Sequence, residues 1–98
     1  MFKKRRSIKV SYNRQGLIHF ICVNVRSLPI EVNTRILSLC YEVAGEHGEA
    51  LYTMLTDDTK NVHGVAMQYY LSESQLYAYR KKFYEKFEAV ITDRVGQI

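Results

Sequence analysis

The spacing of hydrophobic positions predicts two kinds of secondary structure along the chain. From residue 8 to residue 12 every second residue is hydrophobic, turn-forming residues follow at 13–16, and residues 17–25 are rich in β-branched and aromatic side chains. Period-two alternation before the turn and a run rich in β-branched and aromatic residues after it predict a β-hairpin over 7–26. Its second strand is apolar on both faces, so we expect another element to cover it.

Beyond the hairpin, apolar residues recur every three or four positions, which predicts helices over 29–44 and 46–55. Gly45 marks the end of the first of these helices. Two more helices are expected over 61–81, and an apolar stripe continues the last one to about residue 92. The expected fold class is therefore α+β, mainly α: an N-terminal β-hairpin followed by a helical bundle, in a single domain.

Within that bundle, residues 62–81 fit the packing requirements of a helix-turn-helix corner, where two crossing helices need small or apolar residues at their contact. The positions that must point inward are Val65, Ala66, Tyr69, Leu71, Leu76 and Tyr79. Ser72 and Gln75 have the spacing of a capping box, and Asn61 can cap the preceding helix. Tyr70 occupies the first turn position, where glycine is frequent because the backbone tends toward positive φ.

The segment 69–77 (YYLSESQLY) followed by 80–84 (RKKFY) resembles the helix-turn-helix of late-gene transcriptional activators of Gram-positive phages and mobile elements. These activators are themselves similar to the DNA-binding region of sigma factors. The resemblance covers the last third of the chain. It implies a small bacterial or phage regulator that recruits or steers transcription, with RNA polymerase as a candidate partner beside double-stranded DNA.

The corner also predicts which side chains contact DNA, because the second helix of such a motif lies in the major groove. The residues expected at base edges are Ser72, Glu73, Ser74, Gln75, Tyr77, Ala78 and Lys81. Gln75 has two open interpretations, since a glutamine can read adenine or close the capping box. The residues expected at the phosphate backbone are Lys3, Lys4, Arg5, Arg6, Arg80, Lys82 and Lys86.

The positions of the charged residues along the chain support DNA binding more than the net charge does. The net charge is +4, yet the chain through residue 14 carries six cations and no acid, while the remainder has eight basic and ten acidic side chains. Residues 1–6 are expected to form a mobile basic arm, which either enters a minor groove or serves as a solubilising tail. The cations from Arg80 to Lys86 directly follow the predicted reading positions.

Other chemistries are less well supported. His19 and Cys22 are three residues apart, which places them on opposite faces of a strand, so we expect no metal site and no cofactor. The Asp57 and Asp58 pair is interpreted as a loop and not as a catalytic dyad, and we expect no enzyme activity. Cys22 and Cys40 are expected to be reduced and buried, as in a cytoplasmic protein, and no apolar run is long enough to span a membrane.

Two alternatives remain open at this stage. The apolar stripe of the last helix either packs inside the protein or forms the seam of a homodimer, since helix-turn-helix proteins often pair on symmetric half-sites. The rival function is a small protein-interaction module that binds a host or partner protein through its aromatic C-terminal helix. Tyrosine supports this rival because such side chains are frequent at interface hot spots, and the chain has eight of them.

Overall fold

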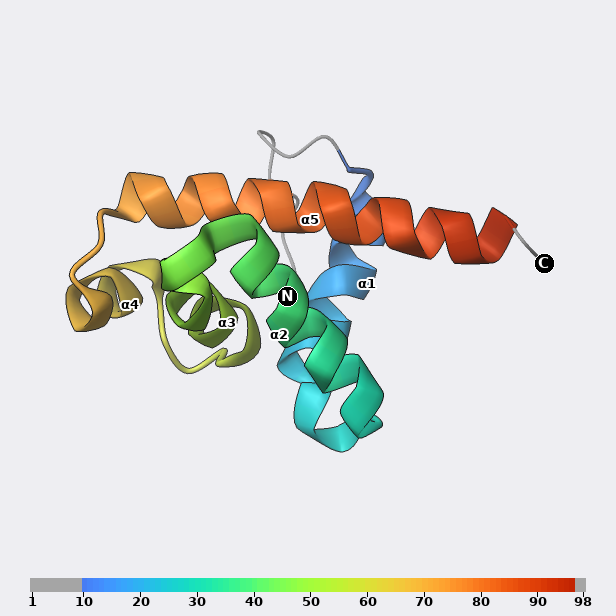
Figure 1. Ribbon diagram of the computed structural model, residues 1–98, viewed down its shortest axis with the longest axis horizontal. Coiled ribbons are helices and arrows are strands. Elements are labelled where there is room, and N and C mark those ends of the chain that lie inside the picture. The colour runs from blue at the N-terminus through green and yellow to red at the C-terminus, as the bar shows by residue number, and fades with distance from the viewer. Residues whose placement is uncertain (1–9, 97–98) are drawn as a thin grey trace.

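The computed structural model describes the backbone of residues 10–96 and the side chains of residues 10–90, and this part of the chain consists of helices joined by turns and loops, with no strand (Figure 1). The α-helices are α1 (Tyr12–Val23), α2 (Ile30–Ala44), α3 (Gly48–Thr56), α4 (Val62–Tyr69) and α5 (Glu73–Gly96). Two short 3-10 turns, η1 (Val25–Ser27) and η2 (Gly45–His47), join the first three helices. In Figure 1, α5 runs along one side of the molecule and the other helices lie beneath it.

The predicted β-hairpin over 7–26 is wrong, because α1 and η1 occupy residues 12–27; residues 7–9 lie outside the described part. Ser11 caps α1, since its hydroxyl oxygen accepts a hydrogen bond from the Arg14 amide at 3.3 Å. The buried positions Ile18, Cys22 and Val25 recur at helical spacing. A short apolar run is compatible with the period of a strand and with that of a helix. Here the contacts of α1 with α3 and α5 stabilise the helix. The described fold is therefore all-helical.

The larger core lies among α1, α2, α3 and α5. Its largest fully buried side chains are Ile18, Ile36, Leu51 and Phe83. Cys22 and Cys40 are both reduced and buried in this core. Burial raises the pKa of the Cys40 thiol to about 12 and raises that of Cys22 as well, so both sulfurs stay protonated and unreactive at neutral pH.

A second, smaller core lies where α3, α4 and the start of α5 meet. It is built from Ala50 of α3, Val65 and Ala66 of α4, and Leu76 of α5. The small side chains of the two alanines allow the three helices to approach closely. α3 thus adds a third helix to the predicted two-helix corner, and we call this three-helix unit the corner.

The apolar stripe of α5 is used mostly inside the protein. Phe83 is fully buried and Tyr79 and Phe87 pack against the larger core, whereas Val90 is 43% exposed. The stripe therefore joins both cores along one helix, which agrees with internal packing as the main reason for it. None of the helices within residues 10–96 combines the length and the hydrophobicity that a membrane span requires.

Candidate nucleic-acid interface

The turn of the corner follows the backbone path that its template requires. Tyr70 has φ 58° and ψ 44°, in the left-handed region, and its side chain is 95% exposed. The amides of Tyr70 and Leu71 both donate to the carbonyl oxygen of Ala66. A tyrosine in this conformation costs about 1 kcal/mol relative to glycine. The chain keeps the turn although the residue disfavours it.

The hydrogen bonds that begin α4 and α5 confirm both predicted caps. The Asn61 side-chain oxygen accepts from the Gly64 amide at 2.7 Å. The Ser72 hydroxyl oxygen accepts from the Gln75 amide at 3.1 Å, and the Gln75 side-chain oxygen accepts from the Ser72 amide at 3.0 Å. Of the two interpretations of Gln75, the structure shows the cap. Its side-chain oxygen is directed back along the helix start.

Four of the predicted base-reading residues share one outward face of α5. Ser74, Tyr77 and Ala78 are exposed and Lys81 is half-buried, and their spacing of three, four and seven residues places them along one stripe of the helix. Leu76 lies on the opposite side of α5, fully buried in the corner. We call this set of four residues the outward stripe.

Glu73 is directed elsewhere. Its carboxylate lies 3.3 Å from Nδ1 of His63, so this contact links the first turn of α5 to α4. A hollow of about 470 Å³ lies beside the turn and includes Met67 and Tyr70 in its lining. Sequence reasoning missed the contact, because residues ten apart on different helices leave no periodic signal.

The basic cluster that follows the outward stripe is divided among different faces of α5. Consecutive helical residues are rotated by roughly 100°, so Arg80, Lys81 and Lys82 cannot all face one groove. The Arg80 guanidinium carbon lies 4.8 Å from the centre of the Tyr77 ring, a stacking contact that the spacing of three residues could have suggested. Lys81 belongs to the outward stripe, Arg80 flanks it beside Tyr77, and Lys82 flanks it on the other side, four residues after Ala78.

Lys82 and Lys86 lie on another side of the helix, four residues apart. Lys82 is exposed, and the Lys86 ammonium lies 3.9 Å from a carboxylate oxygen of Glu42 on α2. Lys86 therefore lies on the side of α5 that is next to α2, and not at the corner. Its predicted role at a DNA phosphate is the one that this geometry supports least.

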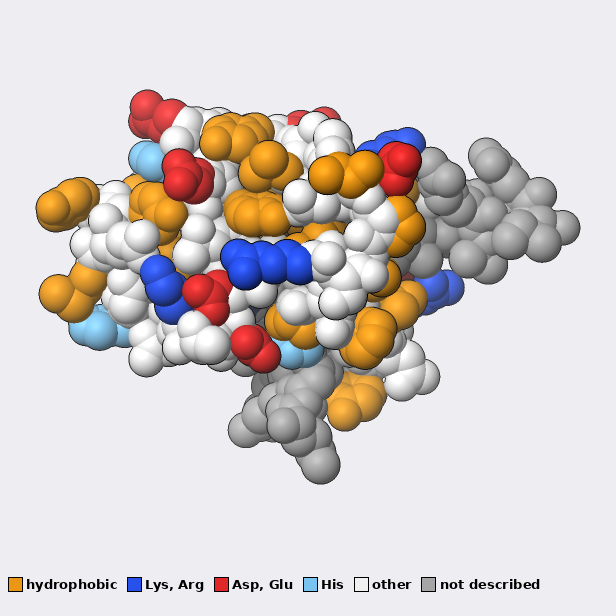
Figure 2. Space-filling model, turned by 90° about the horizontal axis from the view of Figure 1, so that it is seen from below, with side chains coloured by type: hydrophobic (Ala, Val, Ile, Leu, Met, Phe, Trp, Pro, Cys, Tyr) orange, Lys and Arg blue, Asp and Glu red, His pale blue; other side chains and the backbone are white. Residues whose placement is uncertain are grey.

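The described part of the chain carries little net charge. Five of the fourteen lysines and arginines lie in residues 1–9, which leaves nine cations against ten acids and a formal charge of −1 for residues 10–96. The predicted arm, with Lys3, Lys4, Arg5 and Arg6, lies outside the described residues. Figure 2 shows the face opposite α5, where hydrophobic, acidic and basic side chains are interspersed.

The loop between α3 and α4 has a structural explanation. The Asp57 carboxylate accepts hydrogen bonds from the hydroxyl and the amide of Thr59, and these bonds lower the pKa of Asp57. The aspartate thus stays ionised and closes the loop. Among the described residues, no group of three or more histidine, cysteine and acidic side chains is arranged to hold a metal ion.

Comparison of the chain with protein-family models, with curated proteins and with solved structures gives no match.

Proposed function

We propose that the protein binds double-stranded DNA through the corner and acts as a sequence-specific transcription regulator. The observation that carries this proposal is the outward stripe, which begins at a capped helix start and projects from the corner, where α3, α4 and α5 share a small core. In DNA-binding proteins of this geometry, the N-terminal half of the second helix contacts base edges in the major groove.

The stripe residues supply chemistry that suits this role. Lys81 donates to guanine or to a phosphate, Ala78 contacts a thymine methyl group, and Ser74 donates or accepts at a base edge. Arg80 stacks on Tyr77, and this stack presents a phenol and a guanidinium together beside the sugar-phosphate chain. Ser72, Glu73 and Gln75 are engaged in the cap or with His63, so we assign them to positioning α5.

Because the described part has a formal charge near zero, its affinity for DNA must depend on a few individual cations. Phosphate contacts dominate protein–DNA affinity, so Arg80 and Lys81 must act together with the cations of residues 1–9. Because a bacterial or phage regulator meets DNA in the cytoplasm, the proposal includes a cytoplasmic location and no enzyme activity. RNA polymerase enters as a second partner through the resemblance to late-gene activators.

The first test is selection of bound sequences from a random duplex library with the purified protein. Enrichment of a defined motif is expected, and the mass of the complex with that duplex reports whether one or two copies bind. If no motif is enriched and only weak, salt-sensitive binding remains, the proposal of sequence-specific recognition is wrong.

The second test places the interface on α5. Lys81→Ala is expected to lower affinity for the selected duplex about tenfold or less, and to reduce the slope of log affinity against log salt by about 1, because one phosphate or base contact is lost. Arg26→Ala is the matched control, since Arg26 is an exposed cation on η1 and its removal changes the net charge equally. Equal losses in both variants would contradict the assignment of the interface.

The rival function, a protein-interaction module, has one supporting observation. Met67 and Tyr70 are 67% and 95% exposed beside the hollow at the turn, and exposed apolar side chains near a concavity are typical of protein contacts. Capture of the same partner by the parent and by Lys81→Ala, but not by Met67→Glu, would favour this rival. Normal duplex selection by Met67→Glu would favour DNA binding.

A further inference from the structure

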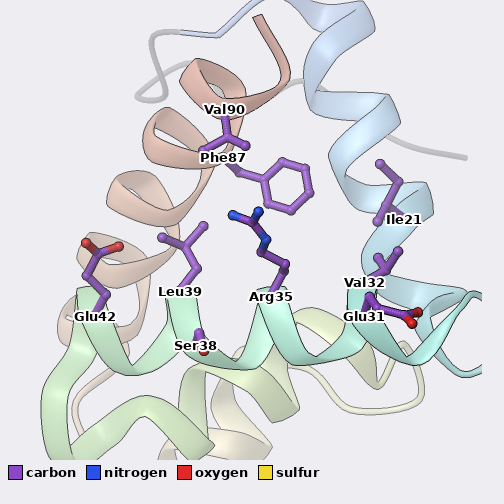
Figure 3. Close-up of a pocket in the computed structure, with 9 residues that line it drawn as sticks. All are labelled: Ile21, Glu31, Val32, Arg35, Ser38, Leu39, Glu42, Phe87 and Val90. Carbon is purple, nitrogen blue, oxygen red and sulfur yellow. The ribbon is translucent and has the colours of Figure 1, made fainter. Parts of the chain in front are cut away.

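A groove of about 840 Å³ lies between α1, α2 and the second half of α5, away from the corner (Figure 3). Its apolar lining comes from all three helices and consists of Ile21, Val32, Leu39, Phe87 and Val90. Volumes of about 300–1,000 Å³ with mainly apolar walls are typical of small-molecule sites. The groove is therefore large enough for a small-molecule ligand. It uses the second half of α5, whereas the outward stripe lies on the first half.

One cation projects into this groove. In Figure 3 the Arg35 side chain rises from α2 and its guanidinium points toward Phe87. Arg35 has no hydrogen bond or ion pair with any described residue. Arg35 is exposed at the open side of the groove, and a guanidinium there can bind a carboxylate through two parallel, charge-assisted hydrogen bonds. The chemistry of Arg35 is thus complementary to a carboxylate.

Two acids at the groove's ends narrow the choice of ligand. Glu42 lies near Lys86, with 3.9 Å between the charged atoms, and Glu31 points toward α1, away from the guanidinium (Figure 3). These carboxylates repel a second negative charge on the ligand, which disfavours nucleotides and polyphosphates. A single carboxylate on a flexible apolar body meets Arg35 without approaching either acid.

We propose that the groove binds an amphipathic monocarboxylic acid, with its carboxylate on Arg35 and its apolar body against Leu39, Phe87 and Val90. The proposal does not depend on DNA binding, because the groove shares no residue with the outward stripe. It assigns a ligand class to the outer surface of the larger core, against which Ile21, Val32, Leu39 and Phe87 pack.

The test is a titration of the full chain, without DNA, with decanoate, decanol and decyltrimethylammonium below their aggregation concentrations. Backbone amide NMR shifts locate the binding and calorimetry measures it. We expect decanoate to bind at least about tenfold more tightly than decanol, the size of one charge-assisted interaction, and the cation to bind most weakly. The shifted amides are expected on α2 and on α5 near Phe87.

Variants separate the charge from the apolar walls. Arg35→Gln is expected to reduce decanoate affinity to that of decanol, and Val90→Asp to weaken both ligands, because it places a charge on the apolar wall. Arg26→Gln, which removes an exposed cation outside the groove, should match the parent. Circular dichroism shows whether each variant keeps its helices.

Four results would overturn the proposal. The first is equal affinity of the parent for decanoate and decanol, and the second is parental decanoate affinity in Arg35→Gln. The third is the absence of saturable binding. A doubled mass in solution together with groove shifts that depend on protein concentration would assign the groove to a second copy of the chain and would also contradict a ligand site.

Discussion

The corner and the larger core are stabilised in different ways, although α5 belongs to both. The larger core buries eleven side chains, including Phe83, Ile18 and Ile36. The corner buries four, of which two are alanines, and relies on side-chain hydrogen bonds at its turn and helix starts. At roughly 25 cal/mol per Å² of buried apolar area, the larger core contributes most of the free energy of folding.

This difference indicates which region opens first. Regions with few buried apolar contacts open locally at lower free energy than the whole molecule, and binding surfaces are often drawn from them. The corner carries the proposed DNA-binding stripe and the smaller core. We therefore expect α4 and the start of α5 to exchange amide hydrogens faster than the second half of α5.

Removing a large side chain from the larger core should have the greatest effect. Phe83→Ala deletes a fully buried ring and is expected to lower the free energy of unfolding by about 3–5 kcal/mol, which unfolds both regions together. Urea unfolding followed by circular dichroism measures the loss. Phe20→Ala is the matched control, because Phe20 is 60% exposed, and its effect should stay within about 0.5 kcal/mol. Similar losses in both variants would contradict the placement of the larger core.

The junction between α2 and α3 sets how the corner meets the rest of the molecule. A Cβ added to Gly48 would lie 2.5 Å from a ring carbon and 2.9 Å from the Cα of Tyr41. Because the backbone atom cannot move aside without shifting α2, Gly48→Ala is expected to cost about 1–3 kcal/mol. Glu49→Ala at the exposed neighbouring position serves as control. Unchanged denaturant midpoints for Gly48→Ala would show that the two helices are less closely packed.

The smallest expected change is a gain at the turn. Tyr70→Gly removes an unfavourable left-handed conformation and a side chain that is almost fully exposed, so stability should rise by about 0.5–1 kcal/mol, a few degrees in Tm. Tyr70→Phe keeps the backbone cost and should leave Tm unchanged. A lower Tm for the glycine variant would mean that the exposed ring makes a stabilising contact.

The corner could be predicted from the sequence because its requirements are local. The inward positions from Val65 to Tyr79 and the caps at Asn61 and Ser72 depend on neighbours within a few residues. The hairpin prediction failed because residues 17–25 are hydrophobic on both sides, so their period is ambiguous until α3 and α5 are known. Rotation around α5 also separates cations that are consecutive in the sequence. The groove joins residues of three helices, and no local pattern indicates it.

The length of α5 gives the molecule a mechanical property. Its 24 residues form one continuous rod of about 36 Å, with the outward stripe near one end and the groove near the other. A rod of this length that tilts by about 5° about one end moves its other end by about 3 Å, close to the rise of one base-pair step. A small change of angle at the groove would thus become a displacement of about one base-pair step at the outward stripe, where we propose that DNA binds.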